Sequence, residues 1–293
     1  MRRLIVLPLL AALLVGGCSD DETTSPSTNG TLKLAITGLE DLGATAQYEG
    51  WIMVNGAPKS TGTFTVNSSG TLSKTEFTLS PADLSAATAF ILTVEPKPDP
   101  SSAPSDAHIL AGDFSGSNAA ITVGHGAAIG NNFASASGKY ILATPTDGDG
   151  THEGSGIWFL DLVGGAPATG LNLPTLPTGW TYEGWVVING VPVTTGRFAS
   201  AAAADNAAPF SGNQPAPPFP GEDFLKNAPG GLSFPTTLNN QVTAISIEPV
   251  PDNGPAPFGL KPLLSTIPAA ASDHVVYSLE NKSSTMPTGT ATR

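Results

Sequence analysis

The sequence predicts an all-β protein, built as two similar antiparallel β-sandwich modules that arise from an internal duplication and follow a flexible N-terminal tether. A seventeen-residue stretch occurs twice, at residues 48–64 and 182–198, with ten identical positions. Apolar residues alternate with other residues in both copies, which is the period of a β-strand. Charged residues make up only 12% of the chain, whereas glycine and proline number 33 and 27. This composition is typical of short strands joined by many turns.

The duplication extends to a second block in each copy. Residues 89–104 and 242–257 share an apolar alternation that runs into Glu-Pro-x-Pro-Asp and then Ala-Pro. The two blocks lie 19 residues farther apart in the second copy. We place this insertion at about 200–231, where alanine, proline and glycine are frequent, and predict a surface loop there. Two copies are too few for a solenoid, so the repeat predicts two domains or two halves of one.

The local pattern predicts a strand, a tight turn and a second strand in each copy. Asn55-Gly56 and Asn189-Gly190 lie between the strand patterns and predict type I′ hairpins. Residues 80–84 predict a short helix, because Ser80 is a good N-cap and proline suits the first helical position. Further strands are expected over 31–36, 89–95, 139–144 and 156–162.

The predicted boundaries follow from these features. They are a signal segment at 1–17, a tether at 18–30, a first repeat at 31–123, a linker at 124–138, a second repeat at 139–280, and a loosely ordered C-terminal tail at 281–293.

The N-terminus resembles a bacterial lipoprotein signal. Arg2 and Arg3 precede an apolar run that ends in Val-Gly-Gly before Cys18. The run is too short to span a bilayer comfortably, and a positive start followed by an apolar stretch is the layout of a secretory signal. Cys18 is the single cysteine of the chain, and lipid attachment would explain an odd cysteine in an exported protein. The alternative is an ordinary signal peptide with a coincidental cysteine.

Residues 19–30 are polar and acidic, as expected of a tether that separates a folded body from a membrane. The lipobox resemblance implies a cell-envelope protein on the periplasmic face, and Ser19 after the cysteine favours the outer membrane. The net charge of −12 argues against nucleic acid as a partner, because acidic proteins repel phosphate backbones.

Both copies also resemble the extracytoplasmic C-terminal domain of anti-sigma-K-type factors. The features are an aromatic-x-x-Trp strand, a turn, a Pro-containing segment that ends in Gly-x-Phe, and an apolar strand that runs into Glu-Pro. The first set is Tyr48, Trp51, Pro58, Gly62, Phe64, Glu95 and Pro96, and the second is Tyr182, Trp185, Pro192, Gly196, Phe198, Glu248 and Pro249. The resemblance covers most of residues 31–114 and 156–260.

This resemblance implies a compact β-sandwich with a sensory or protein-contact role outside the membrane. The family joins that domain through a membrane helix to a cytoplasmic part that holds a sigma factor. This chain shows no such helix or cytoplasmic part, so sigma binding does not carry over.

The repeated polar and aromatic positions have two readings each. Glu95 and Glu248 could bind a ligand, but a strand end beside proline favours structural carboxylates that accept backbone N–H groups from the next loop. Trp51 and Trp185 could stack on a sugar, but they suit a small β core better. Tyr48 and Tyr182 complete the structural signature.

The loop over 147–153 is the strongest metal candidate in the sequence. Asp147, Asp149 and Glu153 alternate with glycine and could wrap Ca²⁺. The loop lacks the spacing of an EF-hand, and a hairpin loop of turn-forming residues is the alternative. No cofactor is expected.

No catalytic motif is present, and the four histidines are scattered, so we expect that the protein is not an enzyme. The leading hypothesis is a lipid-anchored binding or sensory module that contacts another envelope protein through the Pro-rich loops and the insertion. The alternative is a structural or carbohydrate- or Ca²⁺-binding envelope lipoprotein. Oligomeric state stays open.

Overall fold

The computed structural model describes residues 29–293. Cys18, the signal segment and residues 19–28 of the tether lie outside the described residues. In the described part, no helix has both the length and the apolar character needed to cross a membrane.

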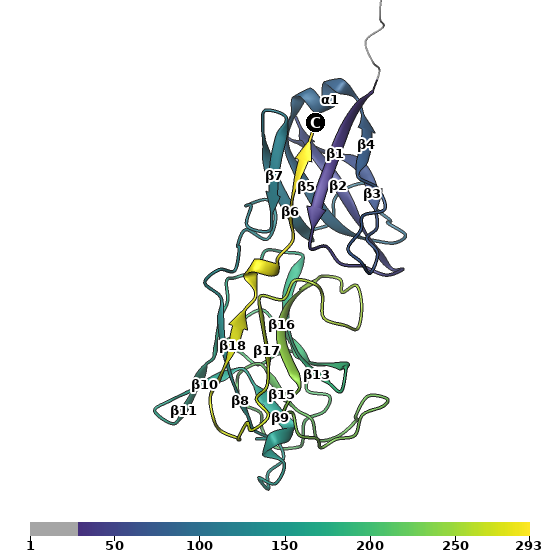
Figure 1. The fold of residues 1–293 in the computed structure, drawn as a ribbon. Helices are drawn as coiled ribbons and strands as arrows, with labels where there is room; N and C mark the ends of the chain where they lie inside the picture. The colour runs from purple at the N-terminus through teal and green to yellow at the C-terminus, as the bar shows by residue number, and fades with distance from the viewer. Residues whose placement is uncertain (1–28) are drawn as a thin grey trace, which may run out of the picture.

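The predicted all-β class is confirmed. The chain forms two stacked modules, each built on one large antiparallel sheet (Figure 1). The first module comprises β1 to β7, helix α1 (Pro81–Ala86) and the last strand, β19; the second module comprises β8 to β18. The start of β1 and the end of β19 lie at the same end of the first module, away from the second (Figure 1).

The strands of the first module are β1 (Gly30–Thr37), β2 (Ala46–Val54), β3 (Ala57–Phe64), β4 (Glu76–Leu79), β5 (Ala87–Pro96), β6 (His108–Ser115), β7 (Asn118–Thr122) and β19 (Thr288–Thr292). Those of the second are β8 (Ser137–Leu142), β9 (Gly156–Trp158), β10 (Leu160–Val163), β11 (Ala166–Thr169), β12 (Leu171–Asn172), β13 (Trp180–Ile188), β14 (Val191–Phe198), β15 (Gly221–Asp223), β16 (Val242–Pro249), β17 (Leu263–Thr266) and β18 (Tyr277–Asn281).

Each sheet curls until its two ends meet. The first sheet has the order β3-β2-β5-β6-β7-β19-β1-β4, and β3 contacts β4. The second has the order β14-β13-β16-β17-β18-β8-β9-β15, and β14 contacts β15. Each module is therefore close to a barrel, an arrangement that leaves few unpaired strand edges.

The local predictions for the hairpins and the helix are confirmed. Asn55 and Gly56 have φ of 53° and 79°, as a type I′ turn requires, and Asn189 and Gly190 have 51° and 85°. The side chain of Ser80 caps α1 by accepting from the backbone N–H of residue 83 at 3.3 Å.

The prediction of a loosely ordered C-terminal tail is wrong. Residues 288–292 form β19, which pairs with β1 on one side and with β7 on the other. The sequence of β19, Thr-Gly-Thr-Ala-Thr, has no apolar alternation. Ala291 is its one fully buried residue, so the strand is held mainly by backbone pairing. Such a strand leaves little signal in the sequence.

The insertion is also more than a surface loop. The extra length lies on both sides of β15, and Phe210, Phe224 and Phe234 pack together with ring centroids 5.3–5.9 Å apart. Phe224 is fully buried, so the insertion adds a small aromatic core to the second module.

The modules pack firmly against each other. One continuous cluster of buried apolar residues contains members of both. The Thr45 hydroxyl donates to the carbonyl oxygen of Asn253 at 3.1 Å, and the backbone N–H of Gly259 donates to Glu40. The Pro-rich loops that follow β5 and β16 line a cavity of about 80 Å³ at this junction, so part of their surface faces the other module.

Gly179 is expected to be indispensable at the junction. Its φ is +89°, and a Cβ there would lie 2.2 Å from the carbonyl oxygen of Asp106 in the first module. We expect Gly179→Ala to destabilise the protein by about 2–4 kcal/mol through backbone strain and overpacking. Chemical denaturation measures this. Gly230→Ala is the control, because nothing lies within 4 Å of a Cβ at that position; equal stability of the two variants would contradict the expected clash.

Candidate functional site

The repeated tyrosines and phenylalanines belong to the main core, whereas Trp51 is buried in a separate small cluster with Ile91, Ala111 and Ala128. Tyr48 and Tyr182 stack on Phe64 and Phe198, with centroids 5.5 and 5.6 Å apart. All four tryptophans of the chain are buried, each no more than 6% exposed. Trp51 and Trp185 therefore cannot offer an open face to a sugar.

Each repeat contains a chain of hydrogen bonds that ends on the carboxylate of the Glu-Pro motif. In the first module, Trp51 Nε1 donates to Thr93 Oγ1 at 2.9 Å, and that hydroxyl donates to Glu95. The backbone N–H of Ser105, in the loop after Glu95, also donates to this carboxylate at 2.9 Å. The carboxylate thus fastens its Pro-rich loop to the strand.

The second module repeats this network. Trp185 Nε1 donates to Ser246 Oγ at 2.8 Å, and Ser246 donates to Glu248. The backbone N–H of Phe258 donates to the same Glu248 oxygen at 2.9 Å. The other oxygen, Oε2, is buried and has no hydrogen-bond partner within residues 29–293. The shared arrangement gives Glu95 and Glu248 a structural role, and the hydrogen bonding of the Glu248 carboxyl group is less complete.

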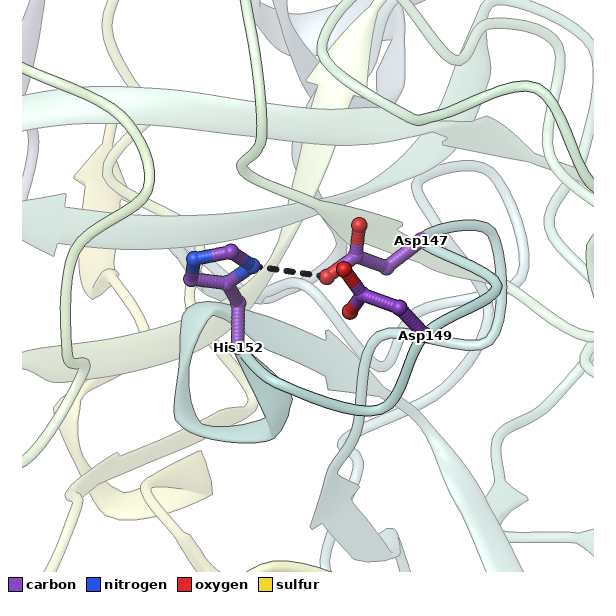
Figure 2. A group of neighbouring side chains, drawn as sticks. All are labelled: Asp147, Asp149 and His152. Carbon is purple, nitrogen blue, oxygen red and sulfur yellow. Dashed lines mark hydrogen bonds and ion pairs between the residues drawn. The ribbon is translucent and has the colours of Figure 1, made fainter.

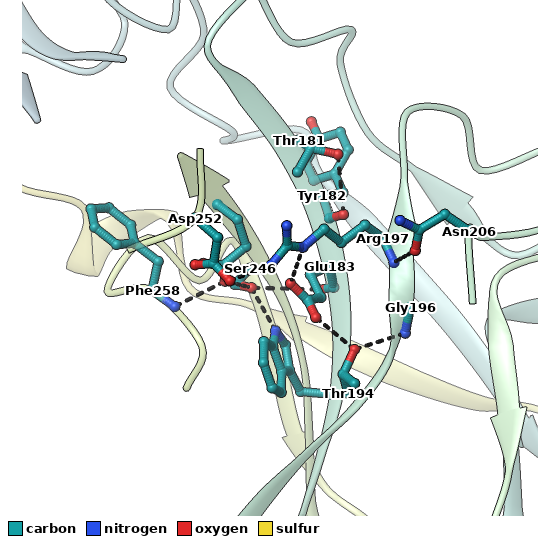
Figure 3. Close-up of polar contacts among 12 residues, drawn as sticks. Thr181, Tyr182, Glu183, Thr194, Gly196, Arg197, Asn206, Ser246, Asp252 and Phe258 are labelled. Carbon is teal, nitrogen blue, oxygen red and sulfur yellow. Dashed lines mark hydrogen bonds and ion pairs between the residues drawn. The ribbon is translucent and has the colours of Figure 1, made fainter. Parts of the chain in front are cut away.

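An arginine distinguishes the second network from the first. Arg197 Nε donates to Glu183 at 2.9 Å, and the same guanidinium pairs with Asp252 in the Pro-rich loop (Figure 3). The matching position in the first copy is Thr63, which cannot form the ion pair with Glu49 that Arg197 forms with Glu183. Glu183, Arg197 and Asp252 border a cleft of about 270 Å³. The pairing ties the loop to β13 and β14.

Burial raises the pKa of four carboxyl groups in the second module, those of Asp205, Glu222, Asp223 and Glu248. The pKa of Glu248 and of Glu222 rises to about 7, and that of Asp205 to about 6, with desolvation as the main cause. In each case the folded state favours the protonated form. Their contribution to stability is therefore fully present below the ordinary pKa, near 4.5 for glutamate, and is lost as pH rises through 6–7.

We therefore expect the melting temperature to be higher at pH 5 than at pH 8. For Glu248 alone, the change from 4.5 to about 7 corresponds to about 3 kcal/mol. Glu248→Gln should flatten the pH dependence, because glutamine does not ionise. Thermal melts of both proteins between pH 5 and pH 8 measure this. An unchanged slope in the variant would contradict the assignment to Glu248, and Asp113→Asn, at an exposed carboxylate, is the control.

The predicted metal loop joins β8 to β9, at the end of the second module that lies away from the first module (Figure 1). Asp147, Asp149 and His152 each direct one ligand atom to a common point, and these atoms lie within 4.8 Å of one another (Figure 2). His152 Nδ1 lies 2.8 Å from Asp147 Oδ2. Hydrogen bonds from Thr151 lower the pKa of Asp149.

Glu153 does not join this group. Its Oε2 accepts the backbone N–H of Thr144 at 2.8 Å, which closes the base of the loop. The third ligand is His152 in place of the expected Glu153. Glu153 begins the 3₁₀ helix η1 (Glu153–Ser155). A mixed set of carboxylates and imidazole suits Zn²⁺ or another transition ion better than Ca²⁺.

A cleft of about 340 Å³ lies beside the loop. Its lining is Thr151–Ser155 on one side and Pro235–Thr237 on the other. The walls are small and polar, and His152 and Glu153 are the titratable groups among them. His152 belongs both to the cleft and to the candidate metal-binding group of Asp147, Asp149 and His152. The cleft and this group therefore form one candidate site in the second module.

Two buried acids in the insertion, Glu222 and Asp223, belong to no sequence motif. Asp223 is fully buried and accepts from Thr146 N and from Trp158 Nε1, both at 2.7 Å. Glu222 accepts from Ser211 and from the backbone N–H groups of Phe210 and Asp223. The Asp223 bonds hold the insertion against the barrel, and their donors lie 65 and 77 residues away in the sequence, so no local motif marks them. The Glu222 bonds join parts of the insertion to each other.

Comparison with known proteins yields no relationship: no family model, curated protein or solved structure matches the chain.

Proposed function

We propose that the protein is a lipid-anchored extracytoplasmic binding or sensory module that contacts another protein of the cell envelope. Cys18 would carry the lipid, and the predicted tether at 18–30 would connect it to the folded modules. The proposal keeps the module type suggested by the resemblance to anti-sigma-K-type factors, without the sigma-binding part. No catalytic role is assigned.

The positions of the N-terminal strand and of the candidate site at opposite ends of the molecule support this proposal. The strand β1 begins at the end of the first module that lies away from the second, and the loop between β8 and β9 lies at the opposite end of the second module (Figure 1). Residues 151–155 of this loop line the cleft beside His152. The two modules form one packed body, because buried apolar residues and Gly179 join them. An anchored protein of this shape would hold its far end away from the membrane surface, where a partner can reach it.

Site-specific photo-crosslinking tests the contact. A photoreactive residue at Thr237, on the cleft wall, is expected to capture one reproducible envelope protein from intact cells that express the full chain. The same residue at Ser117, exposed in a turn of the first module, is the matched control. Equal patterns from the two positions would contradict a partner at the far end. Recovery of glycan or peptidoglycan instead would favour the structural or carbohydrate-binding alternative.

A second candidate is cation binding at the loop over 147–152, favoured by the convergence of Asp147, Asp149 and His152. We expect Zn²⁺ to raise the melting temperature of the protein and to do so more than Ca²⁺, because imidazole is a good ligand for zinc. Asp149→Asn should remove the shift, whereas Asp161→Asn, at a carboxylate paired with Lys139, should keep it. Thermal melts with each ion measure this, and absence of any shift would remove the candidate.

A further inference from the structure

The two sheets have the same strand order once equivalent strands are aligned. Each contains a hairpin with a bulge after the same glycine, at Gly50 in β2 and Gly184 in β13. The equivalent pairs, first module before second, are β3 and β14, β2 and β13, β5 and β16, β6 and β17, β7 and β18, β19 and β8, β1 and β9, and β4 and β15.

One pair in this alignment breaks the order of the chain. β8 follows β7 directly in sequence, yet it lies in the second sheet between β18 and β9. β19 follows β18 directly, yet it lies in the first sheet between β7 and β1. In this alignment the first repeat ends with β8 and the second with β19, so each repeat supplies its last strand to the sheet of the other. The two modules are joined by reciprocal strand exchange.

The two exchanged strands share a glycine at the same place. Gly138 in β8 is the register partner of Leu279 in β18, and Gly289 in β19 is the partner of Ile121 in β7. A Cβ on Gly289 would lie 2.4 Å from the carbonyl oxygen of Ala35 in β1. The slot between β1 and β7 thus admits a strand with glycine at this position and a small residue two positions later, Ala291.

The first module recognises β19 mainly through the backbone. Five residues of β19 have register partners in β1, and five have partners in β7. Arg293 then donates to the carbonyl oxygens of Leu84 and Gly116, and its guanidinium lies 4.5 Å from the Phe114 ring centroid. All these contacts are made to the first module. A main-chain ladder with one charged terminal contact is how an extended segment is bound by a sheet.

The two crossing segments meet at one residue. Asn281, at the end of β18, donates from Nδ2 to the carbonyl oxygens of Phe133 and Ala136, both at 2.8 Å. These carbonyls belong to the segment that leads from β7 to β8, whereas Asn281 begins the segment that leads from β18 to β19. The crossover is thus fastened by a side chain, and no strand pairing is involved in it.

We propose that the slot between β1 and β7 also takes the β19 strand of a second copy of this chain, so that neighbouring copies join by strand exchange. In the sequence, the whole second module lies between β7 and β19. The contacts of the first module with β19 are therefore the same whether the strand comes from its own chain or from another. The choice depends on the connection through residues 282–287, which contains the 3₁₀ helix η2 (Ser283–Thr285) and the buried Met286. A connection that reaches the strand's own slot presents it there at roughly millimolar effective concentration, and one that cannot reach it leaves the slot to another copy.

A pair of single-cysteine variants tests the proposal in the full chain with Cys18→Ser. Asn118 in β7 and Thr292 in β19 are register partners, at a spacing that a disulfide can bridge. Asn118→Cys and Thr292→Cys chains with different tags are expressed together and isolated through one tag. We expect a disulfide-linked dimer that carries both tags, several-fold above the amount formed when Thr63→Cys, exposed on β3, replaces Asn118→Cys.

Two further variants make the result decisive. Asn118→Cys and Thr292→Cys in one chain should form an internal disulfide, which verifies that the slot has the described register. Deletion of residues 283–285 should raise the fraction of dimer in size-exclusion chromatography, because a shortened connection favours exchange between copies. An internal disulfide in the double variant, with no mixed dimer above the Thr63→Cys control, would overturn the proposal. Absence of the internal disulfide would overturn the register on which it rests.

Discussion

Removal of residues 286–293 is expected to destabilise the whole protein by about 5 kcal/mol or more, a value comparable to the total stability of a domain. The truncated first sheet would have unpaired backbone groups along both β1 and β7, and its core around Ile36 and Ile121 would lose its cover. Because the second module contributes β19 to the first, and receives β8 from it, both should melt together.

Thermal unfolding and limited proteolysis measure this effect. The full chain is expected to unfold in one transition, and the truncated chain to be cleaved in both modules under conditions that leave the full chain intact. Thr290→Ala is the control, because this side chain is exposed and its backbone pairing is retained. A truncated chain that melts within a few degrees of the full chain would show that β19 is dispensable.

Asp223→Ala is expected to destabilise the protein by about 3–5 kcal/mol. The carboxylate accepts hydrogen bonds from Thr146 N, Thr146 Oγ1 and Trp158 Nε1, all in a buried environment. Each buried donor left without an acceptor costs about 1–3 kcal/mol. The substitution would also release the insertion from the barrel wall, since Thr146 lies in the loop after β8.

Urea unfolding monitored by tryptophan fluorescence measures the loss, because Trp158 is itself one of the donors. Asp223→Asn, which keeps one acceptor oxygen, should lose less. Asp113→Ala is the matched control: its carboxylate is exposed and lies 3.4 Å from His125, so a change below about 1 kcal/mol is expected. Similar losses from Asp223→Ala and Asp113→Ala would mean that the buried network contributes little.

The candidate site was only partly visible in the sequence. The loop over 147–153 was identified from its alternating acids, and the structure does bring Asp147 and Asp149 together. The third member differs: His152 joins them, whereas Glu153 binds the Thr144 backbone. The cleft beside the loop requires Pro235–Thr237, more than eighty residues later in the chain, and no sequence pattern connects the two segments.

The loops expected to form the contact surface lie in different parts of the molecule. The Pro-rich loops after Glu95 and Glu248 lie at the junction of the modules, and Asp252 is paired with Arg197. Pro235–Thr237, which line the far cleft, follow the insertion in the chain. The Pro-rich loops stay a predicted contact surface, and we propose the cleft beside His152 as a second one.

The sequence by itself determined what depends on neighbouring residues. Asn-Gly pairs require positive φ at two successive positions, so they identify both hairpins, and Ser80-Pro81 identifies the start of α1. The repeat established that two modules share one strand pattern. Only the tertiary structure decided which module each exchanged strand completes. β8 and β19 pair with strands from the other repeat through backbone groups, and backbone pairing between distant segments leaves no periodic signal in the side chains.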